Sequence, residues 1–260
     1  MKPLSHVTAK ASYYNSRAAS YDAFNEQNSK VVNEYIEKVL RECQVKTVLD
    51  LMCGTGSQVF WLHKAGFTAV GVDINQKMLA VAKQKAKKDN LTVRFLKGDC
   101  RTTVLEPCDA VITIFNAIGH LTREDFVRTI VNVRNNLQRD GIYVFDIFNT
   151  DYLLQDDNMT KLTIDKFTTV EGRRMREIQF STITNDGILA SYSTYVIQDG
   201  HAQPTKIVKG YGNTLQCYTA QELKTMLQEH GFTVLQQTGM RGEKFMQYQT
   251  DRLLTVAKRV

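Results

Sequence analysis

Short apolar runs alternate with helical patterns through the first 150 residues of the chain. Each run is almost continuously apolar, as in strands that are buried on both faces. Between the runs, apolar residues recur every three or four positions, as on one face of a helix. This alternation predicts a parallel sheet with helices on both sides, which is the α/β class. The predicted strands are 47–51, 68–72, 93–96, 110–115 and 142–145, and the predicted helices are 29–42, 57–64, 76–88 and 123–139.

Polar residues at the expected helix starts support these boundaries. Asn75 and Thr122 precede two of the helices and can accept hydrogen bonds from the first free N–H groups. Thr219 and Glu222 have the spacing of a capping box, which predicts another helix that begins there. Gly231 is expected to follow the end of that helix, because glycine readily adopts the left-handed conformation found there.

The pattern changes after the fifth apolar run. Polar and apolar residues alternate between 160 and 215, and turn sequences at 185–187 and 199–200 separate the stretches, which predicts antiparallel hairpins. Two later apolar runs, 232–235 and 253–258, are expected to close the main sheet as another hairpin. The predicted organisation is one α/β domain, residues 1–150 and 216–260, with an antiparallel β insertion at 151–215.

Composition narrows the class without naming a function. Apolar residues make up 43% of the chain and charged residues 23%, which is typical of a folded globular protein. No apolar run approaches the ~18 residues of a membrane span, so no membrane partner is expected. The five cysteines include no CxxC pair, which argues against a zinc site or a disulfide framework and favours a reducing, cytoplasmic location.

The chain is mildly basic. Its net charge is +6, from 33 Lys and Arg against 27 Asp and Glu, which admits nucleic acid or an anionic metabolite as a partner. A lysine run at 83–88 and the arginines at 173–176 are either solvated faces or contacts to phosphate groups. Residues 161–210 hold seven Lys and Arg against five Asp and Glu, a balance that disfavours a nucleic-acid surface.

The strongest motif is the strand, turn and helix VLDLMCGTGSQV at residues 48–59. A glycine turn after the first strand lets the backbone approach a ligand at the carboxyl end of the sheet. Gly54 and Gly56 lack the third glycine of a dinucleotide site, and no Gly-Lys-Ser/Thr follows as in a phosphate loop. Asp50, inside the strand, would repel a pyrophosphate but suits a ligand that carries a positive charge.

Two further acids follow the next two strands. Asp73 ends the second strand, where a carboxylate can accept hydrogen bonds from two ribose hydroxyls. Asp99 follows the third strand and is placed to receive the exocyclic amine of an adenine. Together with Asp50, these acids at three successive strands describe a site for a neutral or cationic nucleoside.

These motifs resemble those of class I S-adenosylmethionine (AdoMet)-dependent methyltransferases. The family pattern D-x-[GA]-C-G-x-G is similar to DLMCGTG at 50–56, and its later motifs resemble DINQKML at 73–79 and GDC at 98–100. Met52 stands where the family usually has Gly or Ala. The resemblance implies a Rossmann-like seven-stranded sheet, an antiparallel β insertion after strand 5, and AdoMet as the cofactor.

The resemblance also implies roles for individual residues. Gly54 and Gly56 would pass under the methionine part of AdoMet, and Asp73 would hold the ribose. Asp99 and Cys100 would meet the edge of the adenine, whose pocket Ile74 and Met78 would line. The full cofactor-binding set implied is Asp50, Cys53, Gly54, Gly56, Asp73, Ile74, Met78, Asp99, Cys100 and Phe115, without a metal ligand.

The segment after the fourth strand narrows the resemblance. FNAIGHL at 115–121 lacks the Pro-Pro pair of amino-methylating nucleic-acid enzymes, and no acid cluster for a metal stands near it. It is similar instead to small-molecule N-methyltransferases, especially TDP-amino-sugar N,N-dimethyltransferases and, more loosely, glycine N-methyltransferase. Those enzymes also resemble the chain in an aromatic N-terminal segment followed by Tyr-Asp, here Tyr21 and Asp22, which implies a lid formed by residues 1–28.

Two residues are candidates for catalysis. His120 could position or deprotonate a substrate amine, since an imidazole titrates near neutrality, or it could only satisfy the backbone at a helix entry. Tyr21 is expected to close over the cofactor, although it could also pack the first helix. The acceptor pocket is expected from the insertion, whose tyrosines combine a large ring with a polar tip: Tyr192, Tyr195 and Tyr211.

Three functions remain open at this point. The first is a methyltransferase that acts on a small-molecule acceptor, at an amine nitrogen. The second is an RNA or protein methyltransferase, which only the basic balance favours. The third is a module that binds AdoMet without catalysis. We expect the first, with the protein as a monomer or homodimer.

Overall fold

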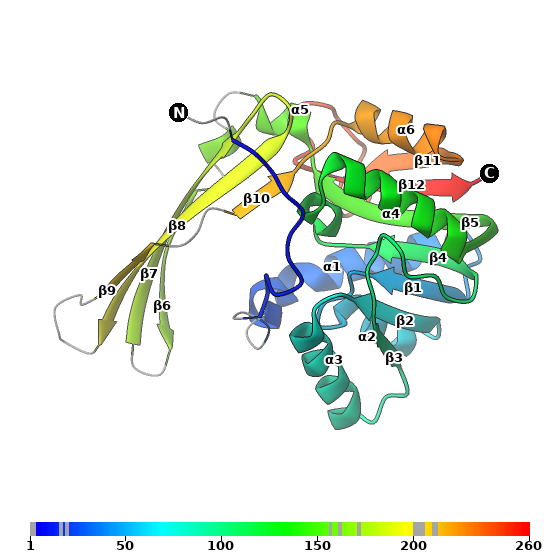
Figure 1. The fold of residues 1–260 in the computed structure, drawn as a ribbon, viewed down its shortest axis with the longest axis horizontal. Helices are drawn as coiled ribbons and strands as arrows, with labels where there is room; N and C mark the ends of the chain where they lie inside the picture. Colours follow the sequence, from blue (N-terminus) through cyan, green and yellow to red (C-terminus); the bar gives the residue numbers. More distant parts are fainter. Residues whose placement is uncertain are drawn as a thin grey trace.

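A seven-stranded sheet forms the centre of the molecule, and a second sheet projects from it (Figure 1). The computed structural model describes residues 4–15, 18, 21–155, 158–160, 163–170, 173–199, 206–209 and 213–260. The strands of the central sheet are β1 (Thr47–Leu51), β2 (Thr68–Asp73), β3 (Arg94–Lys97), β4 (Cys108–Thr113), β5 (Leu137–Phe148), β11 (Phe232–Thr238) and β12 (Arg252–Arg259).

The strand order is β11-β12-β5-β4-β1-β2-β3. Neighbours from β5 to β3 pair in parallel, whereas β12 pairs antiparallel with both β5 and β11. The order reverses beside β1, so the carboxyl ends of β1, β2, β3 and β4 meet at one edge, where open α/β sheets bind ligands. This is the predicted Rossmann-like seven-stranded sheet, and the closing antiparallel pair is also confirmed.

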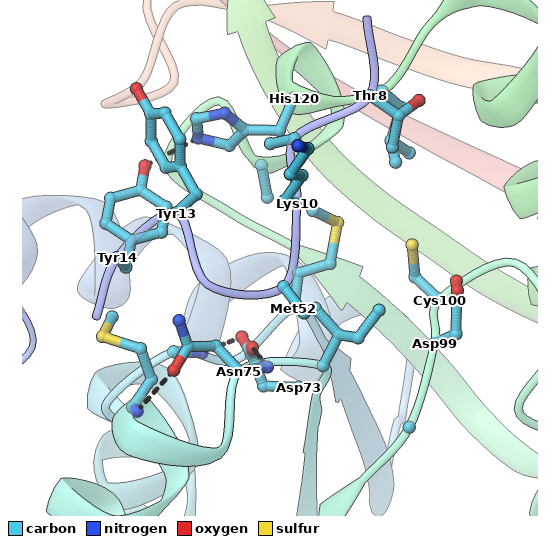
Figure 2. Close-up of a pocket in the computed structure, with 18 of the residues that line it drawn as sticks. Thr8, Lys10, Tyr13, Tyr14, Met52, Asp73, Asn75, Asp99, Cys100 and His120 are labelled. Atoms are coloured by element: carbon cyan, nitrogen blue, oxygen red, sulfur yellow. Dashed lines mark hydrogen bonds between the residues drawn. The ribbon is translucent and has the colours of Figure 1, made fainter.

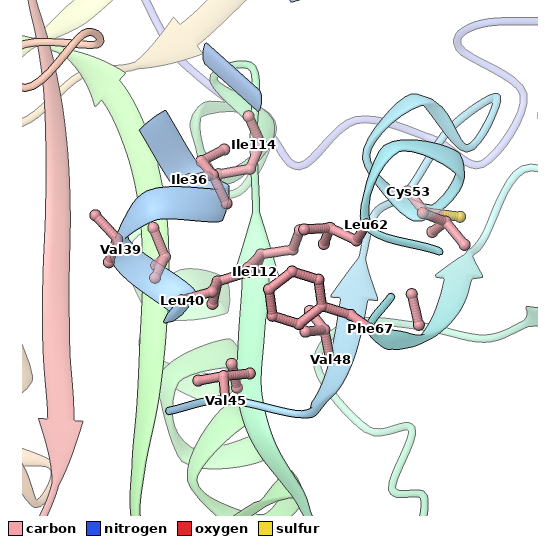
Figure 3. Packing of buried hydrophobic residues seen from close by; sticks show 14 of the residues in the cluster. Ile36, Val39, Leu40, Val45, Val48, Cys53, Leu62, Phe67, Ile112 and Ile114 are labelled. Atoms are coloured by element: carbon pink, nitrogen blue, oxygen red, sulfur yellow. The ribbon is translucent and has the colours of Figure 1, made fainter. Parts of the chain in front are cut away.

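Helices cover both faces of this sheet. Apolar side chains of α1, α2 and α3 pack on one face, where Leu40, Leu62 and Phe67 surround the buried strand residues Val48 and Ile112 (Figure 3). Side chains of α4 and α6 pack on the other face. The helices are α1 (Tyr21–Glu42), α2 (Ser57–Lys64), α3 (Gln76–Lys88), α4 (Arg123–Asn136), α5 (Thr150–Leu153), α6 (Ala220–Glu229) and the short 3₁₀ helix η2 (Ala117–His120).

The predicted helix caps are confirmed. The side chain of Asn75 accepts hydrogen bonds from two backbone N–H groups at the start of α3, and Thr122 accepts one at the start of α4. Thr219 and Glu222 form the reciprocal pair of a capping box at α6. These local bonds fix where the helices begin.

Two helix boundaries differ from the prediction. Helix α1 begins at Tyr21 rather than near residue 29, because its first turn is held by contacts to distant residues that apolar periodicity does not reveal. Helix α4 ends at Asn136, three residues early. The Asn136 side chain bonds to backbone groups of Leu105, Thr103 and Asn132, and the fully buried Leu137 already pairs with β4.

The insertion forms a separate antiparallel sheet that extends away from the central sheet (Figure 1). Its predicted turn at 185–187 is present, and Gly187 has a φ of 82° there, in the left-handed region. Gly200, of the second predicted turn, lies outside the described residues. The order is β10-β8-β7-β6, with β9 paired to β8; the strands are β6 (Ile164–Val170), β7 (Arg173–Ile183), β8 (Ile188–Asp199), β9 (Lys206–Lys209) and β10 (Asn213–Gln216).

Within the described part of the chain, no helix combines the length and the apolar character needed to cross a bilayer. All five cysteines are free thiols, and four of them are buried.

Candidate active site

A pocket lies at the carboxyl ends of β1 to β4, and residues 4–15 pass over it (Figure 2). We call residues 4–15 the strap and this space the cofactor pocket. In Figure 2, Asp73 and Asn75 lie below the strap, Asp99 and Cys100 lie to one side, and Tyr13, Tyr14 and His120 lie to the other. The sequence motifs thus meet in one cavity, since its lining includes Met52, Gly54, Asp73, Ile74, Met78, Asp99, Cys100, Phe115 and His120.

The two glycines of the turn have different surroundings. Gly54 borders the cofactor pocket with a φ of 55°, and a Cβ there would meet only the Met78 methyl group at 3.2 Å. Gly56 is not part of the lining; with a φ of 83°, it lies against Phe95, whose ring would be 2.6 Å from a Cβ. Met52 has a φ of 65° without being glycine, a costly conformation for a residue with a Cβ. Gly54 therefore gives a ligand access to the backbone, whereas Gly56 permits packing.

Asp73 holds two loops in place. Its Oδ2 accepts a hydrogen bond from the Gly54 N–H (2.8 Å), and its Oδ1 accepts one from the Asn75 N–H (2.7 Å). Burial raises the pKa of Asp73, although these backbone bonds oppose the shift. The Ile74 N–H bonds to the same carboxylate, which offers about four acceptor sites in all, so it can still accept a bond from a ligand in the pocket.

Asp50 lies below the glycine turn, fully buried in β1. Its Oδ2 has no hydrogen-bond partner among the described residues. Burial, together with the charge of Asp73, raises the pKa of Asp50 well above its usual value. Two close carboxylates, one of them orphaned, are electrostatically unfavourable until a positive charge lies near. AdoMet carries a sulfonium and an ammonium group, so these residues fit that cofactor.

A buried amide pair continues from the glycine turn. Gln58 Nε2 donates to Asn33 Oδ1 (3.1 Å), and both residues border a groove that also includes Gly54. This bond leaves the Asn33 amide N–H₂ and the Gln58 carbonyl for other partners. Such a donor and acceptor suit the carboxylate and ammonium of an amino acid. Cys53 borders this groove rather than the cofactor pocket, and burial raises the pKa of its thiol.

Asp99 is engaged by its own neighbour. Arg101 donates to Asp99 from Nε (2.9 Å), Nη2 (2.6 Å) and its backbone N–H (2.9 Å), and these bonds lower the pKa of Asp99. Oδ2 takes only one of them and can accept a second donor, such as an adenine amine. Burial raises the pKa of Cys100 to about 12, so its thiol stays protonated and lines the pocket as a small apolar group.

The start of α1 is fastened to the glycine turn. Asp22 accepts hydrogen bonds from Thr55 Oγ1 (2.5 Å) and Lys85 Nζ (2.8 Å). Lys85 of the lysine run therefore has an internal partner. Arg176 pairs with Asp165 on the insertion, which gives that cation a partner within the chain as well.

The strap is bonded along its length. The Ala9 N–H donates to the His120 carbonyl (2.8 Å), and Thr8 Oγ1 donates to Asp125 Oδ2 (2.5 Å). His6 Nε2 donates to the Leu121 carbonyl (3.0 Å), while its Nδ1 lies 2.9 Å from Thr214 Oγ1 in β10. The strap thus connects the central domain to the insertion. Sequence analysis identified an N-terminal lid but not these anchoring residues, which carry no local motif.

His120 and Tyr14 form a hydrogen-bonded pair. The Tyr14 hydroxyl lies 2.7 Å from His120 Nε2, and the Tyr14 ring contacts Tyr21 and Tyr13 edge to face. Burial lowers the pKa of His120 to about 4, with a smaller contribution from nearby His6. The imidazole is therefore neutral at pH 7. Sequence analysis expected Tyr21 to close over the cofactor, and Tyr21 borders both this pocket and its neighbour, but it gave no signal for the bond between Tyr14 and His120.

A second pocket opens on the far side of this pair, below the insertion. We call it the acceptor pocket. It shares Tyr13, Tyr14, Tyr21, Phe115 and His120 with the cofactor pocket, so the two cavities meet at these aromatic residues. Its remaining lining comes from the loop after β4, the insertion and β12: Asn116, Gln179, Leu189, Ser191, Asn213, Leu215 and Arg252.

The expectation for the insertion tyrosines needs correction. Tyr192 stacks on Phe180 with ring centroids 5.1 Å apart, on the outer face of the sheet and outside the acceptor pocket. The alternation of a strand decides this, because its neighbour Ser191 points to the opposite face and lines the pocket. The Tyr195 side chain and Tyr211 lie outside the described residues.

The loop after β4 is held in an unusual conformation. Phe115 and Asn116 have φ values of 67° and 55°, in the left-handed region. Asp146, completely buried in β5, accepts hydrogen bonds from the Phe115 N–H (2.6 Å) and the Asn116 N–H (3.0 Å). These bonds hold Phe115 against both pockets. The sequence offered no signal for Asp146, because the bonds join segments 30 residues apart.

We expect acid to destabilise the protein through His120. Its pKa of about 4 in the folded state is below the value of about 6.5 in an unfolded chain, so below pH 6.5 the unfolded state binds the proton more readily. The free energy of unfolding should therefore fall between pH 6.5 and pH 4, by roughly 3 kcal/mol in total. Denaturant titrations at both pH values, with wild type and His120→Asn, measure this contribution as the difference between the two proteins. Equal pH dependence of both proteins would contradict it.

Comparison with known proteins agrees with the fold. The methyltransferase domain family matches residues 48–141, the segment from β1 into β5. A protein of Geobacillus sp. (strain WCH70) assigned as a methyltransferase is 28% identical over 270 residues, which cover 92% of this chain and 100% of that protein. A glycine/sarcosine N-methyltransferase of Aphanothece halophytica is 34% identical over 134 residues, which cover 50% of this chain and about half (51%) of that enzyme.

A solved structure shares the fold across the whole chain. It is the AdoMet-bound amino pentose methyltransferase from Micromonospora echinaspora, with a TM-score of 0.71 at 19% identity, covering 99% of this chain and 100% of that one. Among the described residues, no group of His, Cys, Asp and Glu side chains gathers that could hold a metal ion. The strand order, the matched domain and the acids at the strand ends agree, and together they support an AdoMet-dependent methyltransferase with a Rossmann-like fold.

Proposed function

We propose that the protein methylates an amine nitrogen of a small molecule held in the acceptor pocket. The observation that carries this proposal is the Tyr14–His120 pair, which stands where the cofactor pocket and the acceptor pocket meet. The named activities of two similar proteins, a glycine/sarcosine N-methyltransferase and an amino pentose methyltransferase, support the same class of acceptor.

In this proposal the residues at the strand ends bind the cofactor. Asp73 would accept hydrogen bonds from the ribose hydroxyls, and Asp99 would accept one from the adenine amine. Asp50 would lie near the positively charged groups of AdoMet. Asn33 and Gln58 would hold the amino-acid end. When bound, AdoMet supplies an electrophilic methyl group, and the protein needs to align an amine lone pair with it and exclude water.

The Tyr14–His120 pair would orient that amine. A group whose pKa is about 4 holds a proton poorly at pH 7, which argues against His120 as the final proton store. A neutral imidazole and a phenol can still accept a hydrogen bond from an amine N–H and so direct its lone pair towards the methyl group. A neutral amine is already a nucleophile, and orientation alone can contribute a large part of a rate enhancement.

Residues 151–215 would act as a cap that selects the acceptor. The insertion contributes Gln179, Leu189, Ser191 and Asn213 to the acceptor pocket, with polar groups that carry no charge. We also keep the predictions of a cytoplasmic location and of a monomer or homodimer. The free thiols of all five cysteines are compatible with a reducing compartment.

The test is a screen of small amines with AdoMet, with the products identified by mass spectrometry. We expect a product one methyl group heavier than the acceptor, with the new methyl on nitrogen. Acceptor binding should change little between low and moderate salt. Efficient methylation of bulk RNA, with affinity that falls steeply with salt, would replace this proposal with the nucleic-acid alternative. Tight AdoMet binding without turnover on any small molecule, RNA or protein would favour a non-catalytic module.

A further inference from the structure

Arg252 is a cation in the wall of the acceptor pocket. It is the first residue of β12 and pairs in register with Phe148 of β5. Its guanidinium lies 5.3 Å from the Phe115 ring centroid and 5.9 Å from that of Phe148. Only 17% of the side chain is exposed, so the charge is partly withdrawn from water.

Asp146 occupies only part of this guanidinium. Arg252 Nε donates to Asp146 Oδ2 (2.6 Å), and Nη2 lies 2.5 Å from the same oxygen. Nη1 makes no hydrogen bond with any described residue, and Nη2 has no other partner there besides the Asp146 carboxylate. Asp146 also accepts the N–H groups of Phe115 and Asn116, so its charge is shared among several donors. The guanidinium thus keeps N–H groups for a further acceptor.

The charge of the pocket has one sign. Arg252 is the lining residue that carries a formal charge at pH 7, since the low pKa of His120 keeps that ring neutral and no carboxylate belongs to the described lining. Gln179, Ser191 and Asn213 supply uncharged donors and acceptors. A partly desolvated guanidinium in such a cavity favours a carboxylate or phosphate, which it can bind with two parallel hydrogen bonds.

We propose that the methyl acceptor carries an anionic group, a carboxylate or a phosphate, and that Arg252 binds this group while Tyr14 and His120 orient the amine. The inference rests on the proposed amine methylation and adds the substrate class to it. Arg252 is then a specificity-determining residue: it binds the acidic end of the acceptor, and Tyr14 and His120 orient the amine at the other end. An amine without an acidic group would lack this anchor.

The first experiment uses pairs of amines that differ in the acidic group. Glycine is compared with glycinamide for the carboxylate, and phosphoethanolamine with ethanolamine for the phosphate. We expect the acidic member of at least one pair to have a KM lower by about tenfold or more, the range of one hydrogen bond to a charged group. The pair that shows the difference identifies which anion the enzyme uses.

Substitutions connect this preference to Arg252. Arg252→Gln should raise KM for the acidic acceptor by about tenfold or more, and by clearly more than KM for the uncharged member of the same pair. Arg252→Lys should restore part of the affinity, because it keeps the charge. Arg176→Gln is the matched control, since Arg176 pairs with Asp165 away from the pocket. Equal KM values within every pair that is methylated, or an unchanged KM in Arg252→Gln, would overturn the inference and leave amine methylation intact.

A binding measurement tests the anion site without turnover. Inorganic phosphate and acetate are titrated by calorimetry into the protein saturated with the demethylated cofactor product. We expect binding of at least one anion that Arg252→Gln weakens and Arg176→Gln does not. If no amine is methylated, the proposed function fails, and Arg252-dependent anion binding still supports the site. The anion site is contradicted if no such binding is found, or if the bound anion does not compete with the acidic amine. Competition matters because Arg252 also borders a groove between α1 and the 239–251 loop.

Discussion

Replacing Asp73 with alanine is expected to weaken binding of AdoMet by about 100-fold or more. A hydrogen bond to a charged group contributes about 1.5–3 kcal/mol, and the proposed site uses this carboxylate for the ribose. The substitution also removes the acceptor for the Gly54 and Asn75 N–H groups, which frees the two loops that border the ribose position. Calorimetry with AdoMet and with its demethylated product measures the change.

Two further variants make this result interpretable. Asp73→Asn keeps one carbonyl acceptor and should give an intermediate loss. Asp165→Ala removes a carboxylate from the exposed face of the insertion and should leave the affinity unchanged. Wild-type affinity in Asp73→Ala, with a folded protein, would show that the cofactor lies elsewhere.

The hydroxyl of Tyr14 is expected to matter for turnover. Tyr14→Phe keeps the ring packed against Tyr21 and Tyr13 but removes the bond to His120 Nε2. Loss of orientation at a reacting group can lower kcat by about 100-fold, and His120→Asn should fall by about 10² to 10⁴. Affinity for AdoMet should stay within about twofold in both variants: the pair borders both pockets, but the proposed bonds to the cofactor are made by other side chains. Steady-state kinetics on the identified amine provide the measurement.

The control for this prediction is Tyr192→Phe, the same chemical change on the outer face of the insertion. It should leave kcat unaltered. The pH dependence carries separate information: with a pKa of about 4, His120 does not titrate between pH 6 and 9, so a flat profile there agrees with orientation by a neutral ring. If Tyr14→Phe and His120→Asn turn over as fast as wild type, the pair is only structural.

The segments predicted most accurately are those fixed by local chemistry. Strand β1 and helix α2 have the expected bounds, because a continuous apolar run, a glycine turn and an amphipathic helix follow one another without interruption. The capping side chains of Asn75 and Thr219 also act within three residues of themselves. The three acids meet at one sheet edge because parallel strands place their carboxyl ends together.

The parts that sequence analysis missed depend on contacts between distant segments. Asp146 and Arg252 meet only because β12 pairs with β5, and His6 reaches Thr214 across 208 positions. No local pattern indicates such a partner. The face of the sheet on which Tyr192 lies depends on its odd or even position along the strand. The sequence pattern indicates that face only weakly where both faces of a strand carry polar residues. The partner of Asp99 is only two residues away, but an arginine after an acid is too common to indicate a salt bridge.

The strap gives the two pockets one common wall. Its residues Thr8 to Ala11 border the cofactor pocket, and Tyr13 and Tyr14 border both pockets. If the bound cofactor holds the strap in one conformation, the acceptor binds to a pocket wall that is already formed. The affinities of the two ligands are then linked. Thermodynamic linkage is reciprocal: the factor by which one ligand tightens the other must be the same in both directions. A tag or truncation near His6 would consequently alter the apparent affinity for both ligands, even though His6 borders neither pocket.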